Sequence, residues 1–487
     1  MPIVRRAVRS AIWLFADDWL NLVWGIVSIA VLARLLGPEV FGTLALAGIS
    51  LGVGAVFLGE TITEGLIQFE DLEEGHCNVA FWLNTCLGAG FAIAIMLFAA
   101  PLSRVFDTPV LAEILPAMAA IGWLGSLGDV PEALLERELE HKKLVIMENL
   151  IGIPCSILTI ILALLGFGIW SIVVSAALTS ILSVIALFWL SNWRPGLAHS
   201  AQTWRDVTRF GRDTLALKCL GYLDDAVPRI ALGAFLGDRA LGLYSIAMTL
   251  AGNVSGLLMG PLSVLAMSVV ARLQTDLAAI RLMLDDVFKL TTFVMYPAIL
   301  GACMAAPLAA PLLLGEGWSG IEAPLIIALL IGLRHATGEF NISILRGLGD
   351  TISPIYSLLA GVALMLVCLP IAVSFGLIGI TSLVALRVFS TWPLTAWFVQ
   401  RRSGYPMWNQ FTLGWHALLI SVIMGVAIAL IFQVAPVKAL ASPVKLGLMI
   451  PIGIAIYSSL FGILWPNQLR EGIARVRALA RGAEQEV

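Results

Sequence analysis

The chain has 487 residues, of which 59% are apolar and 13% are charged. Soluble domains carry about 45–50% apolar and about 25% charged residues, so this composition excludes an ordinary soluble protein and indicates a lipid bilayer. The net charge of -3 says little by itself, because the positions of the charges matter more than their sum.

A helix needs about 20 mostly apolar residues to cross the hydrocarbon region, and about fourteen segments of this chain meet that requirement. The N-terminal MPIVRRAVRS leads into the first of them without a small-residue cleavage site, so we predict a retained span and no signal peptide. The fifth and sixth spans share one apolar block, divided by the turn GFG at 166–168. The predicted spans are 12–34, 41–66, 79–100, 111–131, 146–165, 169–190, 213–235, 240–268, 289–312, 321–346, 354–374, 376–399, 411–433 and 444–465.

The basic residues predict the orientation of these spans. With a cytoplasmic N-terminus, 20 of the 29 Lys and Arg fall on the cytoplasmic side, five fall outside and four lie within spans. This bias follows the positive-inside rule and predicts that both termini are cytoplasmic. The last residues, 466–487, form a predicted cytoplasmic tail with a short amphipathic helix.

Four short motifs recur in the same order about 200 residues further along the chain, and each pairs a span with the span six places later. A repeat of six spans keeps its orientation in the membrane, so the copies are parallel repeats. The matched pairs are LLGPEVFG (35–42) with FLGDRALG (235–242), AAPL (99–102) with AAPL (305–308), IGWLGSLGD (121–129) with IGLRHATGE (331–339), and GFGI (166–169) with SFGL (374–377).

The repeats predict an all-α polytopic membrane protein with two six-helix bundles, followed by two additional helices. The predicted boundaries are 1–200 and 201–405 for the lobes, 406–465 for the additional helices and 466–487 for the tail. Parallel duplication is typical of secondary transporters, whose substrate site lies between the halves. A purely structural duplication is the alternative.

Ionisable residues are unusually frequent inside the predicted spans. A charge at mid-membrane costs roughly 2.5–3.5 kcal/mol on insertion scales, so these side chains are expected to face one another or a water-filled cavity. Glu64 lies near the cytoplasmic end, where solvent can reach it, and Glu60 lies about one turn deeper. The set comprises Asp17, Asp18, Glu60, Glu64, Asp129, Lys218, Asp224, Asp225, Arg229, Arg334, His335, Glu339 and Arg387.

The seventh span carries the densest group of charges, LKCLGYLDDAVPRIALGAFLG. Pro228 lacks a backbone donor, and it predicts an interruption of the helix beside Asp224, Asp225 and Arg229. Interrupted helices with ionisable groups commonly mark transporter binding sites. The alternative is an i, i+4 pair of Asp225 with Arg229 that only neutralises itself.

The tenth span places Arg334 and His335 at mid-membrane, with Glu339 about one turn further on. Asp129 occupies the equivalent position of the first repeat, so each fourth helix directs one carboxylate inward. Paired carboxylates with a histidine suit proton coupling. The alternative is a structural Arg334–Glu339 network.

Several stretches together resemble the Wzx-type polysaccharide exporters, a branch of the superfamily of multidrug, oligosaccharidyl-lipid and polysaccharide flippases. The resemblance runs from about residue 30 to residue 330 and more weakly to about residue 400. The chain departs from the family with GETITEG at 59–65 and with Pro228 where relatives tend to carry Asp. The stretches are ARLLGPEVFG (33–42), EGLIQFEDLEEGHCNVAFWLN (64–84), VPEALLERELEHKK (130–143), LALLGFGIWSIVV (162–174), LGLYSIAMTL (241–250), GPLSVLAMSVVARLQ (260–274) and LLLGEGWSG (312–320).

The resemblance implies a V-shaped core of two six-helix lobes in the bacterial inner membrane. It also implies an undecaprenyl-diphosphate-linked oligosaccharide as substrate, with other polysaccharide assembly proteins as candidate partners besides membrane lipids, and no nucleic acid. Because guanidinium groups suit phosphate, we hypothesise that the diphosphate is bound by Arg334, Arg229, Arg387 and Lys218. We hypothesise further that H⁺ or Na⁺ coupling uses Asp225, Asp224, Glu339, Asp129, His335 and Glu60. No other cofactor or metal is expected.

Two alternatives to a polysaccharide flippase stay open at this point. A drug or cation antiporter of the same superfamily would favour acidic and aromatic lining over arginine. A membrane glycosyltransferase or polymerase generally needs a sizeable extracytoplasmic loop, whereas no predicted outside connection here exceeds about a dozen residues. We therefore expect a transporter and not an enzyme.

Overall fold

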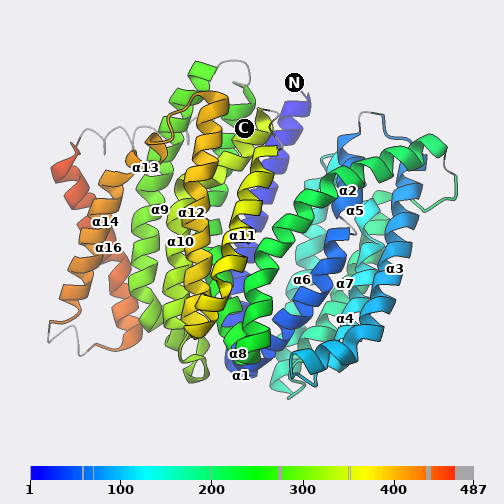
Figure 1. Ribbon diagram of the computed structural model, residues 1–487, viewed down its shortest axis with the longest axis horizontal. Helices are drawn as coiled ribbons and strands as arrows, with labels where there is room; N and C mark the ends of the chain where they lie inside the picture. The colour runs from blue at the N-terminus through cyan, green and yellow to red at the C-terminus, as the bar shows by residue number, and fades with distance from the viewer. Residues whose placement is uncertain are drawn as a thin grey trace. The chain divides into compact units, whose positions relative to one another are not determined.

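The computed structural model describes residues 2–57, 60–69, 71–198, 200–272, 277–348, 350, 352–434 and 440–466. These residues form helices and short connections, with no β-strand among them, which confirms the predicted all-α class. The helices are α1 (Pro2–Phe57), α2 (Glu60–Gln68), α3 (Glu74–Val105), α4 (Leu111–Ser126), α5 (Asp129–Arg137), α6 (His141–Leu164), α7 (Trp170–Ser191), α8 (Ala201–Arg272), α9 (Leu277–Leu314), the 3₁₀ turn η1 (Glu316–Trp318), α10 (Glu322–Gly347), α11 (Ile352–Ser374), α12 (Gly376–Ser403), α13 (Asn409–Thr412), α14 (Trp415–Ile431) and α16 (Ser442–Leu464) (Figure 1).

The helices have the length and surface of membrane spans. Within the described ranges, twelve are long and apolar enough to cross a bilayer, and two of these, in α1 and α8, each cover two predicted spans. Large apolar side chains point outward: Leu97, Trp189 and Ile463 are 74–75% exposed. Such exposure is unfavourable in water and expected in lipid. The chain is therefore a multi-pass membrane protein, while the number fourteen stays a prediction.

The two long helices are broken at positions that the predicted repeat makes equivalent. Gly37 in α1 has φ 76° and ψ 170°, and Gly237 in α8 has φ 81° and ψ 176°. Glycine adopts positive φ without a Cβ clash and commonly ends a helix. Pro38 follows the first break and starts the next helix, a position that proline favours. At the second break, the Asp238 side chain accepts a hydrogen bond from the backbone N–H of Arg239 at 2.8 Å. Both reversals lie at the lower edge of Figure 1.

The interruption predicted at Pro228 is wrong in its position. The backbone of α8 is helical through this residue, and its non-helical residue is Gly237. Proline removes one intrahelical hydrogen bond, but neighbouring helices and local adjustments can compensate for it in a membrane helix. The charged group around Asp225 therefore lies on a continuous helix.

The chain divides into two compact units, residues 1–246 with 365–380, and residues 247–364 with 381–487. In the first unit, α3 packs on α4, α6 on α7, and α2 on α5. In the second, α9 packs on α10, α14 and α16, as Figure 1 shows in green to red. The predicted lobe boundaries stay predictions.

Each unit has an apolar core near one end of its helices. In the first unit, the core contains Leu66 of α2 and Ala80 of α3. In the second, Phe288 of α9 packs with Leu345 of α10 and Val399 of α12, and all three are fully buried. These cores fix the helix ends, so the charged residues of the spans are held on packed helices.

Candidate functional site

Asp225 and Arg229 form an ion pair on α8. The Arg229 Nη2 lies 3.0 Å from the Asp225 Oδ1, and the two side chains are 36% and 55% exposed. The geometry is the i, i+4 pair that the sequence left open as an alternative. The ion pair leaves one donor of Arg229 unused, because the Arg229 Nε–H is buried and has no hydrogen-bond partner among the described residues. Arg229 therefore retains a donor for another acceptor.

Lys218 and Tyr222 connect α8 to the end of α1 and to α2. The Lys218 Nζ lies 3.3 Å from the Glu64 Oε2 on α2. The Tyr222 hydroxyl donates to the carbonyl oxygen of Ile49, and its ring occupies the space that a Cβ on Gly52 would need. These contacts hold the charged stretch of α8 against the second half of α1. Lys218 thus has a carboxylate partner that the sequence did not assign to it.

Asp129 lies at the start of α5 and borders a cavity of about 370 Å³ inside the first unit. The fully buried Asn84 of α3 donates from Nδ2 to the Asp129 Oδ2 at 2.6 Å. Glycines form much of the cavity wall, and Phe91 and Trp123 supply its aromatic surface. The cavity therefore offers one oriented carboxylate in mostly apolar surroundings. An arrangement of this kind can hold a proton or a small cation.

Arg334 and Arg387 belong to the second unit, on α10 and α12. The Arg334 side chain folds over its own helix, so that a Cβ on Gly338 would lie 2.6 Å from the Arg334 Nε. Arg387 leans toward α11, where a Cβ on Gly361 would lie 3.2 Å from its Nε. Both guanidinium groups are half-buried, and each occupies space that a glycine leaves open. Two long cationic side chains are thus accommodated within helical packing.

The structure brings together some of the predicted site residues. It pairs Asp225 with Arg229, and it gives Lys218 the partner Glu64. Asp224 and His335 are half-buried on α8 and α10. The side chains of Glu60 and Glu339 lie outside the described residues, so the proposed network of Arg334 with Glu339 stays a prediction.

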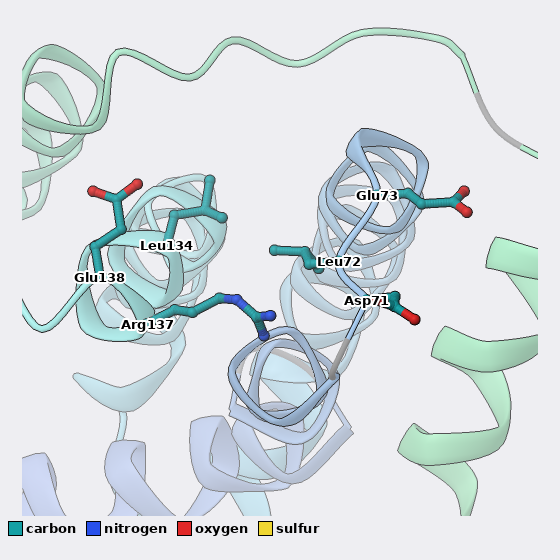
Figure 2. A pocket seen from close by; sticks show the side chains of 6 residues that line it. All are labelled: Asp71, Leu72, Glu73, Leu134, Arg137 and Glu138. Carbon is teal, nitrogen blue, oxygen red and sulfur yellow. The ribbon is translucent and has the colours of Figure 1, made fainter. Parts of the chain in front are cut away.

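A second pocket, of about 540 Å³, lies where α2 and α5 end. Figure 2 shows Arg137 reaching from α5 toward α2, while Asp71 and Glu73 point away from it. The guanidinium donates to the carbonyl oxygens of Leu66 at 2.8 Å and Ile67 at 3.2 Å, which satisfies the end of α2. The acidic side chains do not converge, and no group of three or more His, Cys, Asp or Glu among the described residues could hold a metal ion. This pocket is a capped helix junction.

Sequence reasoning missed Asn84 and Tyr222. Asn84 is an uncharged amide in an apolar run, and its contact with Asp129 depends on how α5 approaches α3, which the sequence does not reveal. A polar residue within a span is the signal that could have singled it out. Tyr222 stands four residues from Lys218 within the charged stretch, so the stretch itself could have drawn attention to it.

The chain is similar to known proteins in both sequence and fold. The polysaccharide biosynthesis protein family matches residues 31–323. The succinoglycan biosynthesis transport protein ExoT of Rhizobium meliloti (strain 1021) is 26% identical over 327 residues, 66% of each chain. The lipopolysaccharide biosynthesis protein WzxC of Escherichia coli (strain K12) is 24% identical over 349 residues, 70% of this chain and 69% of its own.

Among solved structures, the lipid II flippase MurJ in an inward closed conformation has a TM-score of 0.76 at 14% identity. The superposition covers 93% of this chain and 99% of MurJ. Since identity is low, this likeness establishes the fold alone. Because the family match spans more than half of the residues, the chain belongs to the polysaccharide biosynthesis protein family.

Proposed function

We propose that this chain is a flippase that moves an undecaprenyl-diphosphate-linked oligosaccharide from the cytoplasmic to the periplasmic leaflet of a bacterial inner membrane by alternating access. Its family membership supports this proposal, as do relatives named for succinoglycan transport and lipopolysaccharide biosynthesis. The fold shared with a lipid II flippase agrees with a lipid-linked cargo. No catalytic step is proposed.

The observation that carries the binding role is the half-buried Arg229 with its unpartnered Nε–H. A buried donor without an acceptor is unfavourable, so a ligand that supplies one gains free energy. A diphosphate offers several anionic oxygens, and the planar guanidinium fork suits them. Arg334, Arg387 and Lys218 would add positive charge for the diphosphate and sugar, while the polyprenyl chain stays in lipid.

Asp225 would act as an internal counter-ion. It lies 3.0 Å from Arg229 and neutralises it, which lowers the cost of a positive charge within the membrane. A bound diphosphate would displace it, and its return would help to release the cargo. The proposed H⁺ or Na⁺ sites are Asp225 itself, the neighbouring Asp224, the cavity carboxylate Asp129, and Glu60, Glu339 and His335.

The proposal is tested in cells that depend on this chain for polymer export. Deletion should make lipid-linked oligosaccharide accumulate in the cytoplasmic leaflet. Arg229→Ala and Arg334→Ala should abolish export at normal protein level, whereas Arg401→Ala, an exposed arginine over the Trp397 ring, should export normally. Full export by both site variants would defeat the assignment. Uptake of a dye cation by vesicles, without movement of a lipid-linked sugar, would favour the antiporter.

A further inference from the structure

The cavity beside Asp129 lies inside the first unit and has the composition of a small-ligand site. Its volume of about 370 Å³ falls within the range of about 300–1,000 Å³ that such sites commonly have. Its walls combine the rings of Phe91 and Trp123 with the Asp129 carboxylate, and none of its described lining residues is basic. The diphosphate of the proposed cargo therefore does not suit this cavity, whereas an uncharged ligand with an apolar face does.

Glycines shape this cavity and connect it to α8. A Cβ on Gly54 would lie 2.3 Å from the Phe91 ring, so this ring lies against bare backbone. Gly52 lines the cavity as well, and a Cβ on it would lie 2.5 Å from the Tyr222 ring of α8. Tyr222 precedes Arg229 by seven residues, which is about 10 Å along the helix. The cavity thus adjoins the charged stretch that carries Arg229, within the same compact unit.

Two hydrogen bonds fix the orientation of the groups that a ligand would meet. The fully buried Asn84 donates from Nδ2 to the Asp129 Oδ2 at 2.6 Å. A carboxylate accepts several hydrogen bonds, so a ligand hydroxyl can share it with this amide. The Trp123 indole N–H donates to the carbonyl oxygen of Thr85 at 3.1 Å, which holds the ring beside the cavity. A fixed ring next to an oriented acceptor matches a pyranose, whose C–H face is apolar and whose rim carries hydroxyl groups.

We propose that this cavity is a sugar subsite, which takes an uncharged pyranose ring of the lipid-linked oligosaccharide while Arg229 binds the diphosphate. The inference rests on the proposed function for its cargo. The stretch of α8 between Tyr222 and Arg229 is comparable in length with a disaccharide, so a sugar ring reaches the cavity while the diphosphate stays at the guanidinium. Uronic acids are disfavoured, because the Asp129 carboxylate repels a second carboxylate.

Asp129 would serve a proton or an organic cation as well as a sugar. It is a proposed proton site, and a protonated carboxyl accepts fewer hydrogen bonds, so proton uptake would weaken the sugar contact. An organic cation would stack on the Trp123 ring and pair with the carboxylate. The sugar is the better match, because the Asn84 amide already stabilises the negative charge and the proposed cargo brings sugar beside α8.

The test measures binding of free sugars to the full chain in lipid nanodiscs by saturation-transfer NMR. The probes are the methyl glycosides of glucose, galactose and mannose, each with its matching uronide. At least one glycoside should bind, and its uronide should bind at least about tenfold more weakly, because two carboxylates would face each other. Failure of all three glycosides to bind, or equal binding of a glycoside and its uronide, would overturn the subsite. Binding of phenyltrimethylammonium alone would assign the cavity to a cation instead.

Gly122→Leu places the ligand in the cavity, and Gly90→Leu is its matched control. Gly122 lines the cavity, and a Cβ on it meets nothing within 4 Å, so the longer side chain enters open space. A Cβ on Gly90 also meets nothing within 4 Å, but Gly90 is an exposed residue of α3 that does not line the cavity. Gly122→Leu should weaken glycoside binding at least about tenfold, the scale of one misplaced group in a pocket, and Gly90→Leu should leave it unchanged. Equal binding by the two variants would count decisively against the subsite.

A second measurement avoids the larger side chain. In Gly122→Cys, a saturating glycoside should slow the labelling of the new cysteine by N-ethylmaleimide, whereas labelling of Gly90→Cys should not change. Peptide mass spectrometry separates these labels from those on native cysteines. A Gly122→Cys variant that the glycoside does not protect would also overturn the subsite.

The two proposals fail separately. Binding of a free glycoside requires no transport, so its result concerns the cavity alone. If the parent chain bound a glycoside but moved no lipid-linked oligosaccharide, only the proposed function would fall. If it moved the cargo but bound no glycoside, only the subsite would fall.

Discussion

Asp225→Asn is the most informative single change, because it removes a charge and keeps the shape of the side chain. The variant leaves Arg229 in place without its ionic partner. If Asp225 competes with the cargo diphosphate for this guanidinium, removing the competitor should strengthen cargo binding. A residue that only stabilised the helix would give no such gain.

The exposure of the pair sets the expected magnitudes. The Arg229 and Asp225 side chains are 36% and 55% exposed, and exposed i, i+4 pairs contribute only about 0.3–0.5 kcal/mol. Folding stability should therefore fall by no more than about 0.5 kcal/mol. Competition on a similar scale, about 0.5–1.4 kcal/mol, corresponds to a gain in cargo affinity of about two- to tenfold. Tighter holding of the cargo before release should lower the maximal rate by a similar factor.

The assay uses purified protein in proteoliposomes with a fluorescent lipid-linked oligosaccharide, and it measures the rate of appearance in the outer leaflet against cargo concentration. Thermal unfolding in detergent, followed by tryptophan fluorescence, controls for stability. In the double variant Asp225→Asn/Arg229→Ala, the gain should disappear, because no guanidinium is left to bind. An unchanged or weaker affinity in the single variant, with normal stability, would refute the competition.

Three further predictions concern the second unit. Asp350 accepts the backbone N–H of Ser353 at 3.0 Å and the Nε–H of Arg402 at 2.5 Å, so Asp350→Ala should cost about 2–3 kcal/mol from a lost cap and a lost charged hydrogen bond. Asp350→Asn keeps the cap and should cost about half as much in thermal unfolding; equal losses would exclude capping. The Ser353 N–H and the Arg402 guanidinium lower the pKa of Asp350 from 3.8 to about 2. The stability difference between the parent and Asp350→Asn should therefore hold above about pH 4 and shrink as the pH falls toward 2. A stability difference that does not change with pH would contradict this linkage. Asn341→Leu should cost about 1–3 kcal/mol, because the buried Gln410 Nε2–H loses its acceptor Asn341 Oδ1 while the Gln410 Oε1 keeps only the Trp392 Nε1–H. An added Gln410→Leu should recover part of this loss, and a neutral single variant would count against the amide pair.

Local sequence was sufficient for features that depend on neighbouring residues. The turn predicted at 166–168 separates α6 from α7, and the motifs around Gly37 and Gly237 have the same backbone conformation. A turn or a helix end is decided by a few consecutive residues, so these features could be read directly. Pro228 shows the limit of this reasoning, because packing around α8 preserved a helix that the residue alone would disfavour.

Charged pairs were predicted only where both partners lie on one helix. Asp225 with Arg229 follows from the i, i+4 spacing. Lys218 with Glu64 joins residues of different helices, and the sequence holds no information about the rotation at which those helices meet. The partnership of Asn84 with Asp129 escaped for the same reason.

The sequence by itself determined that this protein is helical and lies in a membrane, because burial in lipid depends on the summed character of about 20 successive residues. The internal duplication that it indicates stays a prediction. The sequence also determined which positions carry charge into the membrane. Tertiary structure alone decided which of those charges are neutralised and which donor stays available, as with the Arg229 Nε–H. It also decided that Gly42 lies against Asp238 and Gly242 against Pro38. Such contacts arise only when residues far apart in the chain approach within bonding distance.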